Sequence, residues 1–154
     1  MISACILTDN KLSITQVMPN QPLPADVIWL DVNQPDDEER SWLETLFVED
    51  VPEEDEMDDI ESSSRFRVGP DGVHILSLFP QRLATEIRGV NMSFTMRKNL
   101  LISFREDHVS IVRLLRYYIR HNNVDDIRCA LDILLKLQDL KVDQLSDLIE
   151  DAYS

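Results

Sequence analysis

Acidic side chains give this sequence its clearest chemical potential. Between Asp36 and Glu61 there are fourteen Asp and Glu residues and one base, Arg40, so this segment carries a net charge of −13. The rest of the chain holds fifteen acids against fourteen Lys and Arg, and it is therefore almost neutral. Such a patch repels nucleic-acid phosphates and anionic lipids and concentrates cations or basic partners. The sequence therefore disfavours nucleic-acid binding and favours a cationic ligand.

A dense run of carboxylates suits a hard divalent cation. Mg²⁺ prefers oxygen ligands and usually keeps several of its waters, so one or two carboxylates are enough to hold it. The run is not an EF-hand, because the alternating pattern that starts at Asp55 meets Met57 and has no glycine at its sixth position. Spacing alone leaves two interpretations open for Glu53–Glu61, a cation-binding surface and a solvated helix face.

A second acidic feature lies near the C-terminus. Its four aspartates recur every fourth residue, at Asp139, Asp143, Asp147 and Asp151, and so form one stripe along a helix. Like charges at this spacing destabilise a helix by a few tenths of a kcal/mol per pair. A cation or a basic neighbour would relieve the repulsion, and so would water and salt.

Enzymatic motifs are not found in the sequence. There is no HExxH, no GxSxG, no glycine-rich phosphate loop and no Cys/His cluster with zinc spacing. The three histidines are scattered, and His74 lies in an alternating strand pattern that favours a structural role. Cys5 and Cys129 have no CxxC spacing, which predicts two buried thiols in a reducing compartment. We expect a protein that is not an enzyme.

The elements that would position the acidic residues begin with strands. Seven short segments rich in branched and aromatic residues, bounded by turn residues, are predicted to be strands: Ile2–Thr8, Leu12–Val17, Val27–Val32, Arg65–Val68, Val73–Phe79, Val90–Met96 and Leu100–Phe104. They predict a mixed sheet. Four of its large side chains are expected to be at least partly buried: Trp29, Trp42, Phe79 and Phe104.

Helical patterns lie between and after the strands. Asn33 and Pro35 mark a helix start, and four residues at helical spacing should pack this helix on the sheet: Trp42, Leu43, Leu46 and Phe47. Pro52 is expected to open a second short helix. After Arg105 an apolar stripe is formed by Val109, Val112, Leu115 and Ile119, with Arg113, Arg116 and Arg120 on an adjacent face.

The last segment is predicted to be one long helix from about Val124 to Tyr153, because it contains neither Pro nor Gly. A coiled-coil-like seam runs along it through Leu131, Leu134, Gln138, Val142, Leu145, Ile149 and Ala152. The order of elements predicts an α/β or α+β fold, a mixed β-sheet flanked by helices with a long C-terminal helix. No apolar run is long enough to span a bilayer, and the N-terminus has no signal-peptide pattern.

Several of these segments resemble bacterial CorA magnesium/cobalt transporters. Asp55–Arg67 and Asp71–Phe79 read DEMDDIESSSRFR and DGVHILSLF, similar to the family's "EEMEEIEASSRFY…DGLHI" segment. Val90–Met96 and Asn99–Glu106 are similar to the family's "VAFTL…LFTLRE" strands. The helix leading toward the family's stalk is matched by ALDILL from Ala130 and by DQLSDLIEDAYS from Asp143, and its early Trp-Ile-Asp strand by Trp29-Leu-Asp31.

The resemblance implies a specific architecture and function. Members of the family are homopentameric channels of the inner membrane, with a cytoplasmic N-terminal α/β domain, a stalk helix and two C-terminal membrane helices. Mg²⁺ bound between neighbouring cytoplasmic domains holds the pore closed. One sensing carboxylate lies in the acidic helix and matches Asp59, with Asp58 as the adjacent alternative. The implied ions are Mg²⁺ and, as a second candidate, Co²⁺, both as regulatory ligand and as cargo.

The sequence departs from the family in what it lacks. The Gly-Met-Asn pore motif, the membrane helices and most of the stalk are missing. We therefore expect a truncated, soluble domain from the cytoplasmic side of the bacterial inner membrane, with an α/β unit in residues 1–123 and the start of a stalk-connecting region in residues 124–154. Its partners would be other copies of itself. The alternative is a free-standing acidic module that binds a basic protein, and a carboxylate-based hydrolase ranks last.

Overall fold

The computed structural model describes residues 1–47, 66–69 and 72–153. Seven strands in the described residues form a single sheet with the order β2-β1-β3-β7-β6-β5-β4. Their bounds are β1 Ile2–Thr8, β2 Lys11–Val17, β3 Val27–Asn33, β4 Phe66–Gly69, β5 Gly72–Arg82, β6 Ile87–Arg97 and β7 Leu100–Arg105. The helices are α1 Asp37–Leu46, α3 Ser110–Arg120 and α4 Ala130–Tyr153.

The sheet is mixed, as predicted. Most neighbouring strands in the sheet pair antiparallel. Strands β3 and β7 pair in parallel, with Trp29 opposite Leu101 and Val32 opposite Phe104. This parallel pair joins the N-terminal strands to the strands of the second half of the chain. The α+β class expected from the order of elements is therefore confirmed.

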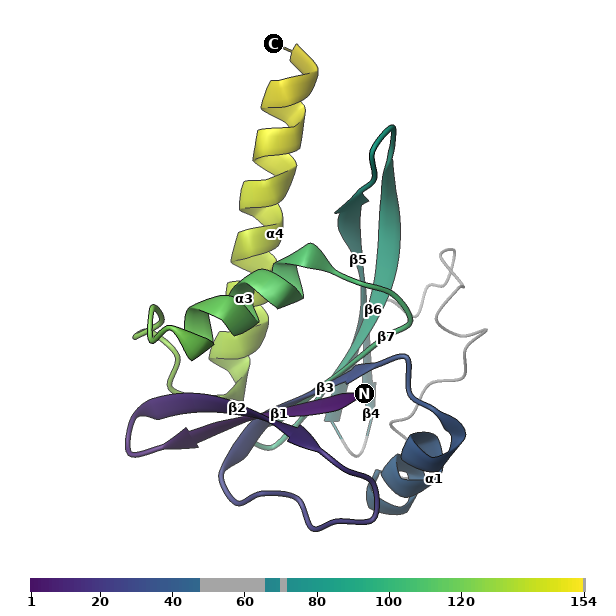
Figure 1. Cartoon of the computed structure of the whole chain (residues 1–154), viewed down its shortest axis with the longest axis vertical. Coiled ribbons are helices and arrows are strands. Elements are labelled where there is room, and N and C mark those ends of the chain that lie inside the picture. Colours follow the sequence, from purple (N-terminus) through teal and green to yellow (C-terminus); the bar gives the residue numbers. More distant parts are fainter. Residues whose placement is uncertain (48–65, 70–71, 154) are drawn as a thin grey trace.

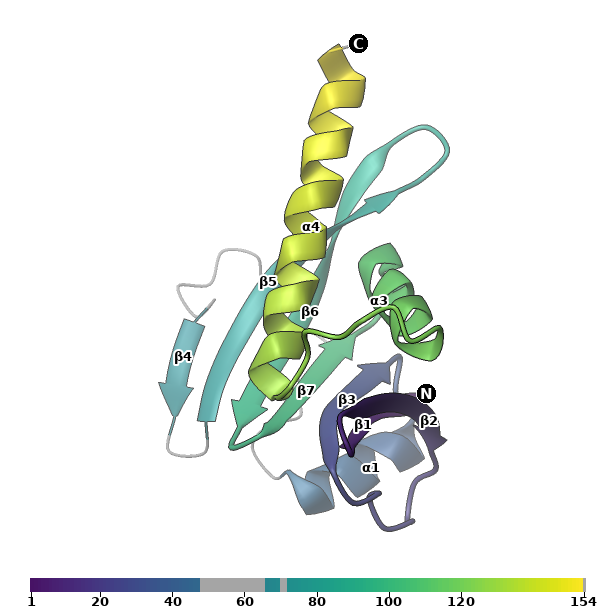
Figure 2. The same ribbon diagram turned by 90° about the vertical axis from the view of Figure 1, so that its left-hand side faces the viewer.

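Helices cover both faces of the sheet, and each face has its own core. Figures 1 and 2 show α1 on one side and α3 with α4 on the other. The α1 side buries Trp42, Leu43 and Phe47 with residues of β1, β3 and β7. The opposite side buries Trp29 and Phe79 with residues of α3 and α4. The described residues thus form three layers around two hydrophobic cores.

The predicted aromatic core residues are buried. Trp29, Trp42, Phe79 and Phe104 are all less than 9 % exposed. The expectation for Leu46 is wrong, because its side chain is 40 % exposed at the end of α1. The helix ends there, and the Phe47 backbone N–H closes its last turn on the Leu43 carbonyl, so that Phe47 rather than Leu46 faces the sheet.

Helix α3 follows the predicted stripe closely. Val112, Leu115 and Ile119 are buried, and Val109 is buried at the position that precedes the helix. The arginines of the adjacent face, Arg113, Arg116 and Arg120, remain outside this core. The strong segregation of apolar and basic residues fixes how the helix sits on the sheet.

Helix α4 differs from the sequence prediction in its start and in its buried face. It begins at Ala130 rather than near Val124. Side chains bond the backbone just before and at its start: the Arg128 backbone N–H donates to the Asp132 carboxylate (2.8 Å), and the Ala130 N–H donates to Oδ1 of the distant Asn99 (2.8 Å). Side chains that fold back on the backbone compete with helix formation.

The face of α4 that meets the sheet is formed by Ala130, Ile133, Leu134 and Leu137. Most of the predicted seam lies elsewhere, since Leu131, Val142, Leu145 and Ile149 are between 38 % and 60 % exposed. Within the residues that the structure describes, no helix is long and apolar enough to cross a membrane.

The outer part of α4 runs beside the long β5–β6 hairpin (Figure 1). Lys141 connects the two: its Nζ donates to Ser77 Oγ (3.0 Å) and lies 4.9 Å from the centre of the Phe79 ring. A cation over an aromatic face adds a modest attraction to the hydrogen bond. The helix is thereby held against the sheet well beyond its buried first turns.

Candidate functional site

The predicted cation-binding residues, Asp58 and Asp59, lie outside the described residues, as does the helix expected to open at Pro52. The structure describes what flanks them. Helix α1 ends at Leu46 on one face of the sheet, and β4 begins at Phe66 at the sheet edge. Asp58 and Asp59 therefore lie in the stretch of sequence between α1 and the edge strand β4.

The first four acids of the segment are described, and three of them have hydrogen-bond partners; Glu38 Oε1 accepts from Asn20 Nδ2 (3.1 Å). Asp36 caps α1: its Oδ1 accepts from the Glu39 backbone N–H (2.7 Å), and Glu39 Oε1 accepts from the Asp36 N–H (3.1 Å). Glu39 is buried and also pairs with the Met1 ammonium (3.1 Å). Asp37 and Glu38 are exposed. Asp36 is exposed as well, so Glu39 alone of these four carboxylates is buried.

The acidic stripe of α4 is solvent-exposed along its length. Asp151 pairs with Arg82 of β5 (3.3 Å), while Asp143 and Asp147 border a groove between α3 and α4. A basic neighbour thus relieves the repulsion at one end of the stripe. In the described part of the chain, no group of three or more His, Cys, Asp or Glu side chains is placed to hold a metal ion.

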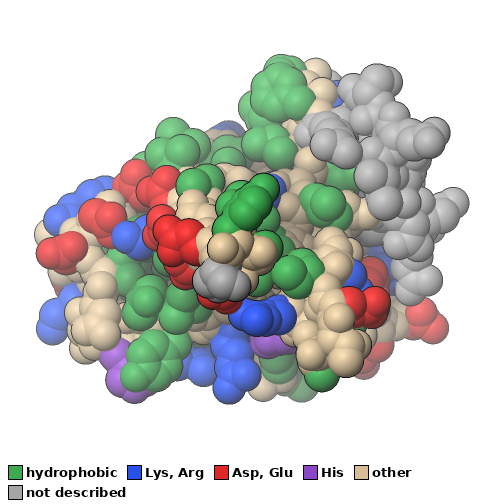
Figure 3. Space-filling model, turned by 90° about the horizontal axis from the view of Figure 1, so that it is seen from above, with side chains coloured by type: hydrophobic (Ala, Val, Ile, Leu, Met, Phe, Trp, Pro, Cys, Tyr) green, Lys and Arg blue, Asp and Glu red, His purple; other side chains and the backbone are tan. Residues whose placement is uncertain are grey.

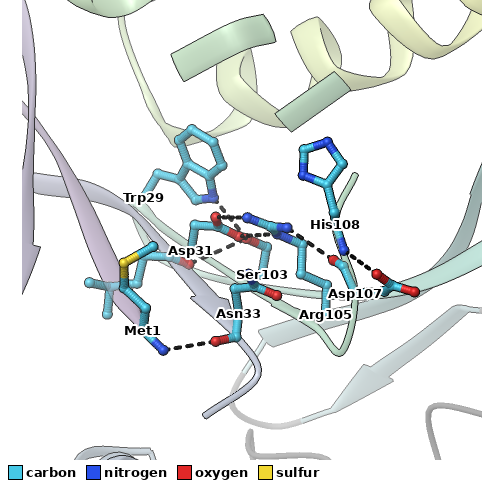
Figure 4. Close-up of polar contacts among 9 residues, drawn as sticks. Met1, Trp29, Asp31, Asn33, Ser103, Arg105, Asp107 and His108 are labelled. Carbon is cyan, nitrogen blue, oxygen red and sulfur yellow. Dashed lines mark hydrogen bonds and ion pairs between the residues drawn. The ribbon is translucent and has the colours of Figure 1, made fainter. Parts of the chain in front are cut away.

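A buried polar network lies between the central strands β3 and β7 (Figure 4). Arg105 Nη2 and Asp31 Oδ2 are 3.0 Å apart, with both side chains no more than 5 % exposed. Ser103 Oγ donates to Asp31 Oδ1 (2.9 Å), and Trp29 Nε1 donates to Ser103 Oγ (2.9 Å). Arg105 Nη1 also donates to the carbonyl of Asp107 (3.0 Å). Buried charges need partners of this kind, and here they connect the parallel strands β3 and β7.

The sequence patterns did not predict the pairing of Asp31 with Arg105. The available signal was Asp31 itself, an acid inside the apolar run Val27–Val32, because an acid in a buried strand requires a charged or hydrogen-bonding partner. The residues around Asp31 do not show which side chain is its partner. That partner is Arg105, 74 residues further along the chain.

His74 and the two cysteines occupy ordinary structural positions. His74 Nδ1 lies 2.9 Å from Thr95 Oγ1 on the neighbouring strand, which fits the structural role expected for it. Both cysteines are free; Cys5 is buried as predicted, whereas Cys129 is half-buried beside the start of α4. Burial raises the pKa of the Cys5 thiol to about 12. Cys5 is therefore a neutral core residue at physiological pH.

Comparison with known proteins gives a consistent family. A family model described as CorA-like Mg²⁺ transporter protein matches residues 24–154. The magnesium transport protein CorA of Escherichia coli (strain K12) is 36 % identical over 155 residues, covering 100 % of this chain and 48 % of that protein. The protein of the same name from Salmonella typhimurium (strain LT2) shows the same identity and coverage. The chain spans about half the length of these curated relatives.

Solved structures show the same fold. The CorA magnesium transporter of Methanocaldococcus jannaschii superposes with a TM-score of 0.75 at 14 % identity, covering 99 % of this chain and 48 % of that one. The ZntB cytoplasmic domain from Vibrio parahaemolyticus gives a TM-score of 0.68 at 15 % identity, covering 98 % of this chain and 62 % of that one. With the family model matching most of its length, this chain belongs to the CorA-like Mg²⁺ transporter family.

Proposed function

We propose that this chain is the cytoplasmic, Mg²⁺-sensing part of a CorA-type transporter of magnesium, with Co²⁺ as a second cargo ion, and that it catalyses no reaction. The observation that carries the proposal is agreement with the transporter family along the chain, from the match over residues 24–154 to the 36 % identity with a magnesium transport protein. We assign the pore to the part of the relatives that this chain does not match.

Sensing is assigned to Asp59, with Asp58 as the adjacent alternative. Support comes from the charge of the segment Asp36–Glu61, which concentrates fourteen carboxylates against one base. Carboxylates crowded at a subunit boundary repel one another, and a divalent ion between them offsets that repulsion. The ion would thereby stabilise the closed arrangement over the open one. Water-mediated binding of this kind has an affinity near millimolar, about 4 kcal/mol.

Assembly with other copies of the chain, as a homopentamer in the intact transporter, is the second part of the proposal. Residues 1–123 would form the cytoplasmic α/β unit and residues 124–154 the start of the connection to the stalk. The exposed apolar residues of α4, among them Val142, Leu145 and Ile149, support this arrangement, because an apolar stripe on a long helix is suited to packing against further helices. The unit would lie on the cytoplasmic side of the bacterial inner membrane.

A chimeric transporter tests the function directly. Residues 1–154 are joined to the half of the E. coli magnesium transport protein that this chain does not match, and the fusion is expressed in cells that lack other Mg²⁺ uptake. We expect growth at low Mg²⁺ and measurable Mg²⁺ influx. A correctly inserted chimera that gives neither would contradict the assignment, whereas binding of a basic protein by residues 36–61 would favour the free-standing acidic module.

The same chimera tests the sensing residue. Asp59→Asn should shift closure to higher Mg²⁺, because one ligand of the closing ion is lost. Asp37→Asn is a matched control, since Asp37 is exposed and belongs to the same acidic segment. If Asp59→Asn and the parent chimera close with the same Mg²⁺ dependence, the site is wrongly assigned.

A further inference from the structure

A pocket of about 530 Å³ opens beside α3 and concentrates positive charge. Arg105, Arg113, Arg116 and Arg120 line it together with two histidines, and its lining contains no Asp or Glu. Seen from above the molecule, blue basic side chains and purple histidines gather along one edge (Figure 3). The volume is typical of small-molecule sites. A cationic pocket of this size stands out in a chain with a net charge of −14.

Of the four arginines, Arg105 alone forms an ion pair among the residues that the structure describes. Arg105 is held by Asp31, which neutralises it. In the described ranges, the side chains of Arg113, Arg116 and Arg120 take part in no hydrogen bond or ion pair. Their spacing of three and four residues places them on one face of α3, where like charges repel. The pocket therefore carries about three uncompensated positive charges at neutral pH.

One buried donor of the pocket lining is unsatisfied. Arg116 Nε is buried without a hydrogen-bond partner, and Arg116 lines the pocket. Burial, together with the charges of Arg120 and Arg105, lowers the pKa of Arg116, while Asp31 opposes the shift. A buried donor without a partner costs about 1–3 kcal/mol, more when it is charged. An anion in the pocket would remove this cost and the repulsion together.

We propose that this pocket binds a small anion that carries two or more adjacent phosphate groups. Guanidinium groups match phosphate oxygens with paired N–H donors, and three such groups on one helix face can contact neighbouring phosphates at once. A single phosphate would leave part of the charge unmatched. A long nucleic acid would be repelled by the acidic segment of the same chain. A diphosphate or triphosphate, inorganic or part of a nucleotide, fits both conditions.

Calorimetric titration of the 154-residue chain with sodium pyrophosphate, in Mg²⁺-free buffer near physiological ionic strength, tests the proposal. We expect 1:1 binding with a Kd below about 100 μM. The double variant Arg113→Gln/Arg120→Gln should weaken binding at least about tenfold, because each charged hydrogen bond to phosphate is strong. Both arginines are exposed, so the variant should fold, which circular dichroism can confirm. Arg116→Gln should weaken binding as well.

Arg67→Gln is the matched control, because Arg67 is an exposed arginine on β4, away from the pocket lining. It should bind pyrophosphate as the parent chain does. The proposal is overturned if pyrophosphate gives no saturable binding, if Arg67→Gln weakens binding as much as the double variant, or if orthophosphate binds as tightly as pyrophosphate.

Titration with ADP identifies the source of the phosphate groups. Tyr117 lines the pocket and stacks on His121 with ring centres 4.0 Å apart, so it offers an aromatic surface to a base. If a nucleotide is the ligand, ADP should bind more tightly than pyrophosphate. Tyr117→Leu should then weaken the binding of ADP but not the binding of pyrophosphate. Equal affinities would identify an inorganic polyphosphate. The proposal uses no residue of the acidic segment, so its outcome is independent of the Mg²⁺-sensing function.

Discussion

The Asp31–Arg105 pair places two opposite charges inside the sheet. It is buried, it joins β3 to β7, and Ser103 completes the hydrogen bonding of the carboxylate. Removing one partner of such a pair leaves an uncompensated charge in the interior, which costs more than the pair itself contributes.

Replacement of Asp31 by Asn should therefore lower the free energy of unfolding by about 3–5 kcal/mol. Urea denaturation followed by Trp fluorescence measures the loss. The double variant Asp31→Leu/Arg105→Met should be less destabilised than Asp31→Asn, since it removes both charges. Equal or additive losses would contradict the account of a coupled pair.

Cys5 should be unreactive in the native protein. Burial raises its pKa from an ordinary value of 9.0 to about 12, and the thiolate is the reactive form. At pH 8, Ellman's reagent should label the half-buried Cys129 first and reach Cys5 after unfolding. Because the unfolded thiol ionises at lower pH than the folded one, this group also makes stability fall as pH rises above about 9. Rapid labelling of both thiols in the native state would refute this assignment.

At the scale of elements, α1 shows how acidic residues serve structure as well as charge. Asp36→Ala removes the side chain that accepts from the Glu39 N–H and should cost about 1 kcal/mol of stability. Asp37→Ala removes the same charge from the next position without removing the cap, and should lower the stability by only a few tenths of a kcal/mol. Thermal unfolding of the two variants at equal pH and salt separates capping from charge. Equal losses would show that capping contributes little.

Helix α4 has two apolar faces with different roles. Ile133 is fully buried against the sheet, and Ile133→Ala should cost about 2–5 kcal/mol. Val142 is 60 % exposed, and Val142→Ala should leave the isolated chain nearly unchanged. Chemical denaturation of both variants measures the contrast. A large loss from Val142→Ala would mean that its face is already covered in this chain, for example by a second copy.

At the scale of the whole molecule, charge is distributed unevenly. The segment Asp36–Glu61 carries nearly all of the net −14, while α3 presents a compact positive pocket on the other side of the sheet from α1. Self-repulsion within the acidic segment destabilises the compact state, and divalent cations should relieve it more than monovalent salt. We therefore propose that the two regions bind ligands of opposite charge.

Mg²⁺ at millimolar concentration should raise the melting temperature of the chain beyond the effect of NaCl at matched ionic strength. At ten times the dissociation constant, linkage gives about 1.4 kcal/mol, a shift of roughly 3–5 °C for a domain of this size. Asp59→Asn should reduce the Mg²⁺-specific part, and Asp37→Asn should alter only the general salt response. Differential scanning calorimetry in the two salts is the measurement, and identical shifts in both would count against specific binding.

The sequence by itself determined the element types, the buried aromatic residues and the family. Strands such as Val27–Asn33 and the stripe of α3 were predictable because periodicity depends on neighbouring residues in the chain. The acidic segment was also evident, because the net charge of a segment follows from its residue types alone. The predicted ligands Asp58 and Asp59 remain a prediction from resemblance.

Only the tertiary structure decided which distant residues meet. The parallel pairing of β3 with β7 brings Asp31 to Arg105 across 74 residues, and no local pattern specifies that partner. The buried face of α4 was also not predictable, because its sequence has two apolar faces. In the structure, the face with Ile133 and Leu137 packs against the sheet. The basic pocket arises because α3 turns its arginines toward the end of β3 and β7. Contacts between distant elements depend on the packing of the whole chain, which is why sequence patterns could not supply them.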